Sequence, residues 1–234
     1  MRACHKHHVK RVVITSSLSA IVAQKPENNR DVYTENDWSD LEACTAYDKS
    51  KTLAEKAAWD FLYSLPESER FELVVINPVF ILGPALVHSD SSPTAVKLLM
   101  GGKIPFLPKV MLVLVDVREC ALAHLRALTV PEARNQRFIL GSSSLWIKDI
   151  AVMLKASFPD YPVPSREIGY CPIKFASFFS SKVKILLPQW NRVLKIDNSR
   201  SKSVLGIEYR DPVETLEAMA KYLIESGAIP DKRK

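Results

Sequence analysis

Residues 10–17 read KRVVITSS, residues 47–62 read YDKSKTLAEKAAWDFL, and residues 73–79 read LVVINPV. The first and third stretches contain apolar, β-branched runs, which are typical of strands buried on both faces of a parallel sheet. Between them, apolar residues recur at helical spacing over 43–65, and Pro66 ends that run. Strand, long helix and strand in this order predict a βαβ unit, and therefore an α/β protein with a parallel sheet covered by helices on both faces.

The rest of the sequence predicts more elements of the same kinds. A helix over 117–128 followed by a strand over 137–140 is typical of one more helix–strand pair of that sheet. Residues 18–40 are polar and predict a long loop. Further helices are expected over 92–100, 147–158, 173–186 and 212–226, with short strands inside 103–115.

The chain of 234 residues carries a formal net charge of +6, which raises the question of a nucleic-acid partner. The basic residues are spread along the chain, and the tight clusters at 6–11 and 232–234 are short. A basic surface that meets a phosphorylated cofactor or an anionic substrate explains the charge equally well. We therefore expect no nucleic-acid partner.

Cysteine spacing and hydropathy bear on the compartment. The four cysteines are far apart and form no C-x-x-C pair, which is typical of free thiols in a reducing compartment. The longest apolar stretch, 73–87, is interrupted by Asn77, Pro78, Gly83 and Pro84, so no run reaches the ~20 residues that a membrane span needs. We expect a cytoplasmic protein without a membrane partner.

Histidines near the start of the chain raise the question of a metal. His5, His7 and His8 have no carboxylate or cysteine at ligand spacing. A solvated polar helix end explains them better, and we expect no metal site.

Tyr47 and Lys51 form a Y-x-x-x-K pair near the start of the predicted long helix. Residues four apart lie on one helix face, about 5–6 Å between Cβ atoms. The lysine ammonium can stabilise the tyrosinate, and such a tyrosine can give a proton to a carbonyl oxygen while hydride arrives from a nicotinamide. The lysine can also hold the ribose of that cofactor.

A second pair with this spacing, Tyr170 and Lys174, has Pro172 between its members. Proline disrupts a regular helix interior, so we expect this pair not to share a helix face. Tyr47 is therefore the candidate proton donor.

Polar residues follow both strands that flank the long helix. Ser16 and Ser17 come at the end of the first strand, where a hydroxyl can donate to a substrate carbonyl. Pro78 and Val79 come at the end of the second strand, where a backbone group can meet a nicotinamide amide. Because ligands collect at the carboxyl ends of parallel strands, these positions support the assignment of Tyr47.

These stretches together resemble the extended short-chain dehydrogenases/reductases of the NAD-dependent epimerase/dehydratase superfamily, in the dihydroflavonol reductase and cinnamoyl-CoA reductase group. The strings that carry the resemblance are KRVVITSSLSAI, YDKSKTLAEKAAWDFL, LVVINPVFILGPAL, SPTAVKLLMGGKIPFLP, VDVRECALAHLRAL, RFILGSS and DNSRSKSVLGIEYRDPVETLEAMAKYLIESG. They cover nearly the whole chain.

The resemblance implies a catalytic set of Ser17, Tyr47 and Lys51, with Ser17 preferred over Ser16 by its place relative to the strand end. It implies cofactor contacts by Tyr47, Lys51, Pro78 and Val79, and by Ser92 as a weaker candidate. The implied activity is NADP-dependent reduction of an aldehyde or ketone, with NAD not excluded. The partner is then a small-molecule carbonyl or alcohol.

The implied fold is a Rossmann-like doubly wound parallel sheet with a smaller C-terminal α+β part that binds substrate. Residues 1–83 would form the C-terminal half of the dinucleotide-binding domain, with 117–141 returning to it, and 84–234 mainly the substrate-binding part. The family begins with further strands and a G-x-x-G-x-x-G turn for the pyrophosphate, which this sequence lacks. Relative to the family, the resemblance therefore predicts a chain that is truncated at its N-terminus.

Two other functions share these residues. Nucleotide-sugar epimerases and dehydratases, and steroid dehydrogenases of the same superfamily, use the same triad. Residues 173–187 hold three phenylalanines, which suit an apolar substrate better than a diphosphate, although core packing explains them equally well. A third alternative is an inactive fragment, because the glycine-rich cofactor turn is missing.

Overall fold

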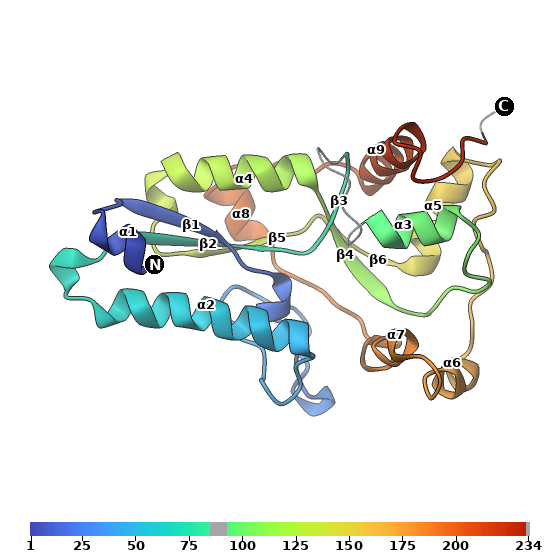
Figure 1. Cartoon of the computed structure of the whole chain (residues 1–234), viewed down its shortest axis with the longest axis horizontal. Helices are drawn as coiled ribbons and strands as arrows, with labels where there is room; N and C mark the ends of the chain where they lie inside the picture. Colours follow the sequence, from blue (N-terminus) through green and yellow to red (C-terminus); the bar gives the residue numbers. More distant parts are fainter. Residues whose placement is uncertain (85–92, 233–234) are drawn as a thin grey trace. The chain divides into compact units, whose positions relative to one another are not determined.

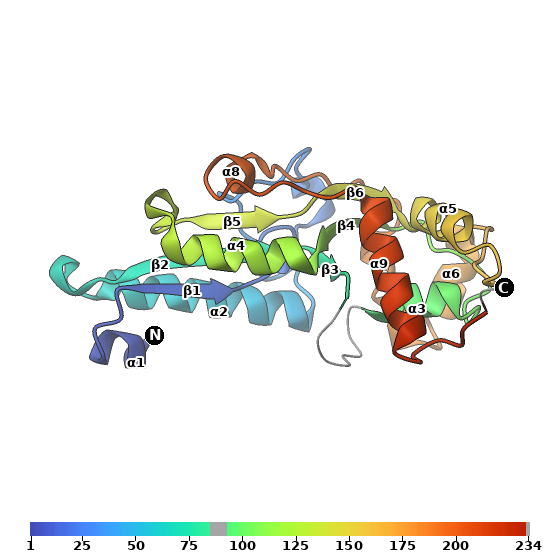
Figure 2. The same ribbon diagram turned by 90° about the horizontal axis from the view of Figure 1, so that it is seen from above.

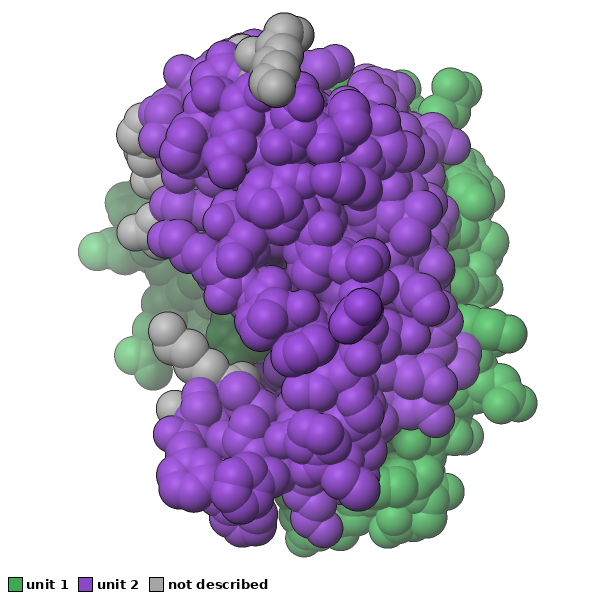
Figure 3. Space-filling view, turned by 90° about the vertical axis from the view of Figure 1, so that its right-hand side faces the viewer, with its two compact units in different colours: residues 1–79, 118–141, 195–209 green, residues 80–117, 142–194, 210–234 purple. Residues whose placement is uncertain are grey.

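The structure is a computed structural model that describes residues 1–84 and 93–232. The chain divides into two compact units, coloured separately in Figure 3. Unit 1 comprises Met1–Val79, Arg118–Gly141 and Lys195–Tyr209, and unit 2 comprises Phe80–Val117, Ser142–Leu194 and Arg210–Lys234.

Unit 1 is built on a three-stranded parallel sheet in the order β1-β2-β5. The strands are β1 (Arg11–Thr15), β2 (Glu72–Pro78) and β5 (Arg137–Leu140). Helix α2 (Ala46–Ser64) covers one face of the sheet and α4 (Val117–Thr129) covers the other (Figures 1 and 2). The predicted βαβ unit and the predicted helix–strand pair over 117–140 are thus confirmed.

The apolar composition of these strands follows from their burial. Leu73 and Val75 of β2 are fully buried and pack with Trp59 and Leu62 from α2. All four residues of β5 are buried as well. Apolar surface removed from water on both faces stabilises such a sheet by roughly 25 cal/mol per Å².

Short elements complete unit 1. They are α1 (Arg2–Lys6), η1 (Leu18–Ala20), η2 (Pro26–Asn28), η3 (Glu67–Glu69), η4 (Pro131–Ala133) and α8 (Ser199–Ser203). The predicted loop over 18–40 contains only the two short 3-10 turns η1 and η2 and is held at Tyr33, whose backbone pairs with the chain at Lys195 and Asp197.

Unit 2 has a mixed three-stranded sheet in the order β3-β4-β6. Strand β3 (Phe80–Leu82) runs parallel to β4 (Met111–Asp116), and β6 (Ser143–Trp146) is antiparallel to β4. The helical elements are α3 (Pro93–Met100), α5 (Ile147–Ser157), α6 (Tyr170–Ala176), α7 (Ser181–Lys184), η5 (Leu187–Gln189) and α9 (Pro212–Glu225).

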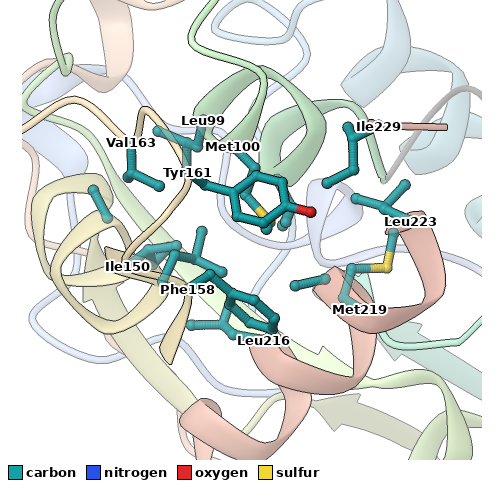
Figure 4. Close-up of a cluster of buried hydrophobic side chains, with 14 of the residues drawn as sticks. Leu99, Met100, Ile150, Phe158, Tyr161, Val163, Leu216, Met219, Leu223 and Ile229 are labelled. Carbon is teal, nitrogen blue, oxygen red and sulfur yellow. The ribbon is translucent and has the colours of Figure 1, made fainter. Parts of the chain in front are cut away.

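The core of unit 2 lies where α3, α5 and α9 meet the sheet. Figure 4 shows Tyr161 among Phe158, Met100 and Met219, all of them buried. The Tyr161 hydroxyl donates to the Pro230 carbonyl at 3.0 Å, so its one polar atom is satisfied inside the apolar cluster.

Two predictions for unit 2 need correction. Strands β3 and β6 were not expected, because they are only three and four residues long and have no clear alternation of their own. The helix predicted over 173–186 is instead two short helices, α6 and α7, separated at Ser177–Ser180.

Within the residues that the structure describes, no helix combines the length and apolar character needed to cross a membrane.

Candidate active site

The start of helix α2 is fixed by a capping box. The Thr45 hydroxyl accepts from the Asp48 backbone N–H at 3.3 Å, and the Asp48 carboxylate accepts from the Thr45 backbone N–H at 3.0 Å. The helix therefore begins at Ala46, which places Tyr47 in its first turn and Lys51 one turn later on the same face. The sheet order and Figure 1 put this end of α2 at the carboxyl ends of β1 and β2.

The polar ends of these two side chains are available. Tyr47 is 58% exposed, and Lys51 is half-buried. Within residues 1–84 and 93–232, neither the Tyr47 hydroxyl nor the Lys51 ammonium has a hydrogen-bond or ion-pair partner. Both groups can therefore bind a ligand without first breaking an internal contact.

Ser16 and Ser17, which directly follow β1, differ in what their hydroxyls do. The Ser16 side chain is buried and its hydroxyl donates to the carboxylate of Glu55. The Ser17 side chain is half-buried, and its hydroxyl oxygen accepts from the Ser19 N–H at 3.2 Å as the cap of η1. The Ser17 hydroxyl proton has no acceptor in the described residues, which favours Ser17 as the hydrogen-bond donor to a substrate carbonyl.

Pro78 and Val79 lie at the end of β2. Pro78 is buried and pairs in register with Leu140 of β5. The Val79 N–H donates to the Leu140 carbonyl at 3.0 Å. Any backbone contact from Val79 to a ligand would therefore come from its carbonyl.

The elements that carry these residues are in contact with one another. Helix α2 packs against η1, which Ser17 caps, and the Asn77 side-chain amide donates to the Ser17 carbonyl at 3.2 Å. Among the side chains of Ser17, Tyr47 and Lys51, no direct hydrogen bond is formed. The last predicted contact residue, Ser92, lies outside the described residues.

A buried polar network beneath the site was not predicted. Glu55 is 1% exposed and forms an ion pair with Arg137 at 2.6 Å. The same carboxylate accepts from Ser16 and, at 2.8 Å, from the Asn77 amide. Glu55 thus connects the residues that precede Ser17 and Pro78 at the two strand ends. The sequence carries one signal of this role, a lone acid eight residues after Tyr47 on the buried face of α2.

Arg137 is held from several sides. Its guanidinium lies 3.9 Å from the ring centroid of Trp38 and donates to the backbone carbonyls of Glu35 and Asp37 at 2.6 and 2.7 Å. These contacts explain how a buried arginine is tolerated.

Glu35 is the second buried acid of this region. Its carboxylate accepts from the Ile139 N–H at 3.1 Å and faces Arg200 at 3.8 Å. Burial raises the pKa of Glu35 above its ordinary value, and the Ile139 hydrogen bond and Arg200 only partly offset that effect.

The expectation for Tyr170 and Lys174 was wrong in its geometry. Both residues lie in α6, and the Lys174 ammonium sits 5.9 Å from the Tyr170 ring centroid. Pro172 is tolerated because it occupies the first turn, where its missing N–H would have no helical partner. The contact is with the ring face, and Tyr170 also packs on Trp190 at 5.9 Å. This pair belongs to unit 2 and not to the strand ends of unit 1.

The chain is similar to reductases of known activity, although no family model matches it. It is 30% identical over 236 residues to the NADPH-dependent methylglyoxal reductase GRE2 of Saccharomyces cerevisiae, covering 93% of this chain and 64% of that protein. It is 30% identical over 235 residues to cinnamoyl-CoA reductase 2 of Arabidopsis thaliana, covering 97% of this chain and 64% of that protein. The chain thus spans about 64% of the length of these curated relatives.

Solved structures agree with this similarity. The crystal structure of yeast methylglyoxal/isovaleraldehyde reductase Gre2 complexed with NADPH has a TM-score of 0.76 and 28% identity, covering 97% of this chain and 68% of that chain. A nucleoside-diphosphate-sugar epimerase from Pseudomonas aeruginosa has a TM-score of 0.79 at 15% identity, covering 98% of this chain and 71% of that chain, which shows the shared fold alone.

The parallel sheet, its crossover helix with the Tyr47–Lys51 pair, and these likenesses define a Rossmann-like α/β protein. The chain belongs to the extended short-chain dehydrogenases/reductases, in the group that includes the cinnamoyl-CoA reductases. The fold class and the family resemblance predicted from the sequence are confirmed.

Proposed function

We propose that the protein to which this chain belongs is an NADP-dependent reductase of aldehydes or ketones, with Tyr47 as proton donor. The observation that carries this proposal is the Tyr47–Lys51 pair: its polar ends have no partner in the described residues, and it stands at the start of α2, the end of the helix near the carboxyl ends of β1 and β2. The similarity to GRE2, a protein described as an NADPH-dependent reductase, supports the same reaction.

Each catalytic side chain has one role. The Tyr47 hydroxyl gives its proton to the carbonyl oxygen of the substrate, and the Lys51 ammonium stabilises the resulting tyrosinate. The Ser17 hydroxyl donates a hydrogen bond to the same oxygen while negative charge develops on it. In the direction of alcohol oxidation the proton moves back to Tyr47.

The residues present fit the nicotinamide end of a dinucleotide. Lys51 would hold the ribose, and the buried Pro78 and the carbonyl of Val79 would border the nicotinamide. Asn77 at the same strand end has a buried side-chain oxygen without a partner in the described residues, so this edge of the sheet has a hydrogen-bond acceptor available to a ligand. The bound cofactor supplies hydride. We propose NADP, with NAD as the alternative, because GRE2 is described as NADPH-dependent.

Unit 2 supports an apolar substrate. It contains a cavity of about 380 Å³ whose lining side chains are all apolar, among them Phe80, Ile104, Leu112 and Ile173. A pocket of this volume accommodates a small organic molecule and offers no cation for a diphosphate. We therefore propose that residues 84–234 mainly bind substrate, and that residues 1–83 with 117–141 form the cofactor-binding part.

The apolar cavity also favours one of the two alternative enzyme functions over the other. A nucleotide-sugar epimerase or dehydratase needs groups that bind a diphosphate, and the likeness to such an epimerase shows the fold alone. A steroid dehydrogenase of the same superfamily remains the second candidate, because a steroid is apolar. We further propose a small-molecule carbonyl or alcohol as partner, no nucleic-acid partner, and a cytoplasmic location, supported by four free cysteines.

The test is NADPH oxidation by the full-length protein to which this chain belongs, with an aldehyde substrate, comparing Tyr47→Phe with Tyr63→Phe. Both tyrosines lie on α2 and are 58% and 57% exposed, so Tyr63 is a matched control. We expect Tyr47→Phe to lower kcat about 10²–10⁴-fold, the usual share of a general acid, and Tyr63→Phe to leave it unchanged. Equal effects of the two substitutions, or none from Tyr47→Phe, would refute the assignment.

A further inference from the structure

Residues 168–196 carry most of the net charge of the chain. This stretch of unit 2 and its boundary contains no Asp or Glu and holds five cations, which gives it +5 of the formal +6 of the whole chain. The cations are Lys174, Lys182, Lys184, Arg192 and Lys195. Such a concentration of one sign on a short segment predicts a surface that attracts anions.

The same segment exposes its aromatic side chains. Phe175, Phe178 and Phe179 are 67%, 77% and 78% exposed, the highest values among the large apolar side chains that the structure describes. Phe175 and Phe179 are four residues apart, and their rings pack edge to face at 5.3 Å between centroids. A cluster of exposed phenylalanines in one place marks an interaction surface.

Helices α6 and α7 pack against each other and lie side by side (Figure 1). Three of their side chains, Ile173, Ala176 and Val183, line the apolar cavity of unit 2, as does Leu186 just after α7. The exposed side chains of the two helices and of the turn between them include the phenylalanines and the two cations Lys174 and Lys184. We call these five exposed residues the Phe/Lys surface.

We propose that the Phe/Lys surface binds the interface of an anionic lipid bilayer, with the phenylalanines in the headgroup–acyl boundary and the lysines at the headgroups. Apolar rings beside cations, without acids, are the composition of interfacial membrane segments. A second copy of the chain is disfavoured as the partner of this surface, because the two segments 168–196 would each carry a formal charge of +5 and repel each other. The three exposed phenylalanine rings favour a lipid surface over an acidic protein, because the headgroup–acyl boundary removes their apolar area from water.

This inference revises the expectation of no membrane partner. That expectation was based on the absence of a spanning run, and interfacial binding requires none. It also agrees with a cytoplasmic location, since the cytoplasmic leaflet is the anionic one.

The test is flotation of the 234-residue chain on a density gradient with vesicles of phosphatidylcholine alone and with phosphatidylserine added, because self-associated chain without lipid does not float. We expect binding to the anionic vesicles only, weakened by salt. Lys174→Gln with Lys184→Gln should lower the partition coefficient about 30-fold, roughly fivefold per lysine. Phe178→Ser with Phe179→Ser should lower it about tenfold or more. Both pairs are exposed, so folding is unaffected.

Matched controls carry the same changes elsewhere. Lys6→Gln with Lys10→Gln removes the same charge from an exposed site in unit 1, and Leu125→Ser with Val152→Ser removes two side chains that are each 60% exposed. These variants should bind vesicles like the unmodified chain. The proposal is overturned if anionic vesicles are not bound, or if the controls weaken binding as much as the Phe/Lys variants do. It is also overturned if the phenylalanine variant only abolishes self-association or binding to an acidic protein.

Discussion

Replacing Glu55 by Gln should destabilise unit 1 more than any exposed substitution. One carboxylate oxygen of Glu55 accepts from both Ser16 and Asn77, and the other accepts from Arg137 at 2.6 Å. A glutamine oxygen can keep the first two bonds, but its NH₂ group then faces the donor of Arg137. Because both charged groups are less than one-tenth exposed, this leaves a buried cation without its counter-ion.

The expected loss is about 3–5 kcal/mol, the cost of breaking a buried ion pair by removing one partner. That is a large part of the roughly 5–15 kcal/mol by which domains are stable. The remaining contacts of Arg137, the Trp38 ring and two backbone carbonyls, reduce the loss toward the lower end. Replacing Arg137 by Met in the same protein should recover about 0.5–3 kcal/mol, since the two changes are coupled.

The assay is urea unfolding, with hydrogen–deuterium exchange of the β2 and β5 amides reporting unit 1 separately. Glu67→Gln is the control, because Glu67 is an exposed acid in unit 1. Surface changes of this kind stay within about 0.5 kcal/mol. If Glu55→Gln falls within that range, or if the Arg137→Met double variant is no better than additive, then the network does not hold the strand ends together.

Three further predictions concern titration, thiol reactivity and cofactor affinity. The pKa of Glu35 is raised above 4.5 in the folded chain, so the protonated carboxyl contributes stability that is full below pH 4.5 and is lost as pH rises through the raised pKa. The free energy of unfolding of Glu35→Gln, relative to that of the unmodified chain, should therefore increase with pH over this window, and a flat difference would refute the reasoning. Burial raises the pKa of Cys120 to about 12, so iodoacetamide should label the exposed Cys171 first, as read by mass spectrometry, and early labelling of Cys120 would contradict this. Strand β1 pairs only with β2 among the described strands, so the isolated polypeptide should self-associate through its free edge, and because the 234 residues contain no glycine-rich turn, it should bind NADPH with a Kd of about millimolar or weaker. Micromolar binding by a monomer in calorimetry would overturn this.

The parts of the fold that the sequence predicts are those with local causes. The β-branched runs of β1 and β2 and the helical spacing of α2 are readable within a few residues, and each was found within about three residues of its observed bounds. Strands β3 and β6 form because β4 pairs with both of them, and that pairing is not visible in three or four residues. The prediction that Pro172 keeps Tyr170 and Lys174 out of one helix was wrong, because proline destabilises a helix interior but is tolerated in the first turn, where Pro172 lies in α6.

The same distinction between local and distant causes explains the site. Tyr47 and Lys51 are four apart on one helix, and Ser17 and Pro78 directly follow or end strands, so spacing alone predicts where they lie. Glu55 and Arg137 are separated by 82 positions and meet only because β5 lies beside β2 and α2 crosses the sheet. That distant contact adds a second reason to prefer Ser17 over Ser16, because the Ser16 hydroxyl donates to Glu55, whereas the Ser17 hydroxyl only accepts, from the Ser19 N–H. A motif can therefore propose the proton donor and its serine, whereas the buried pair that supports the choice of Ser17 is visible only in the folded chain.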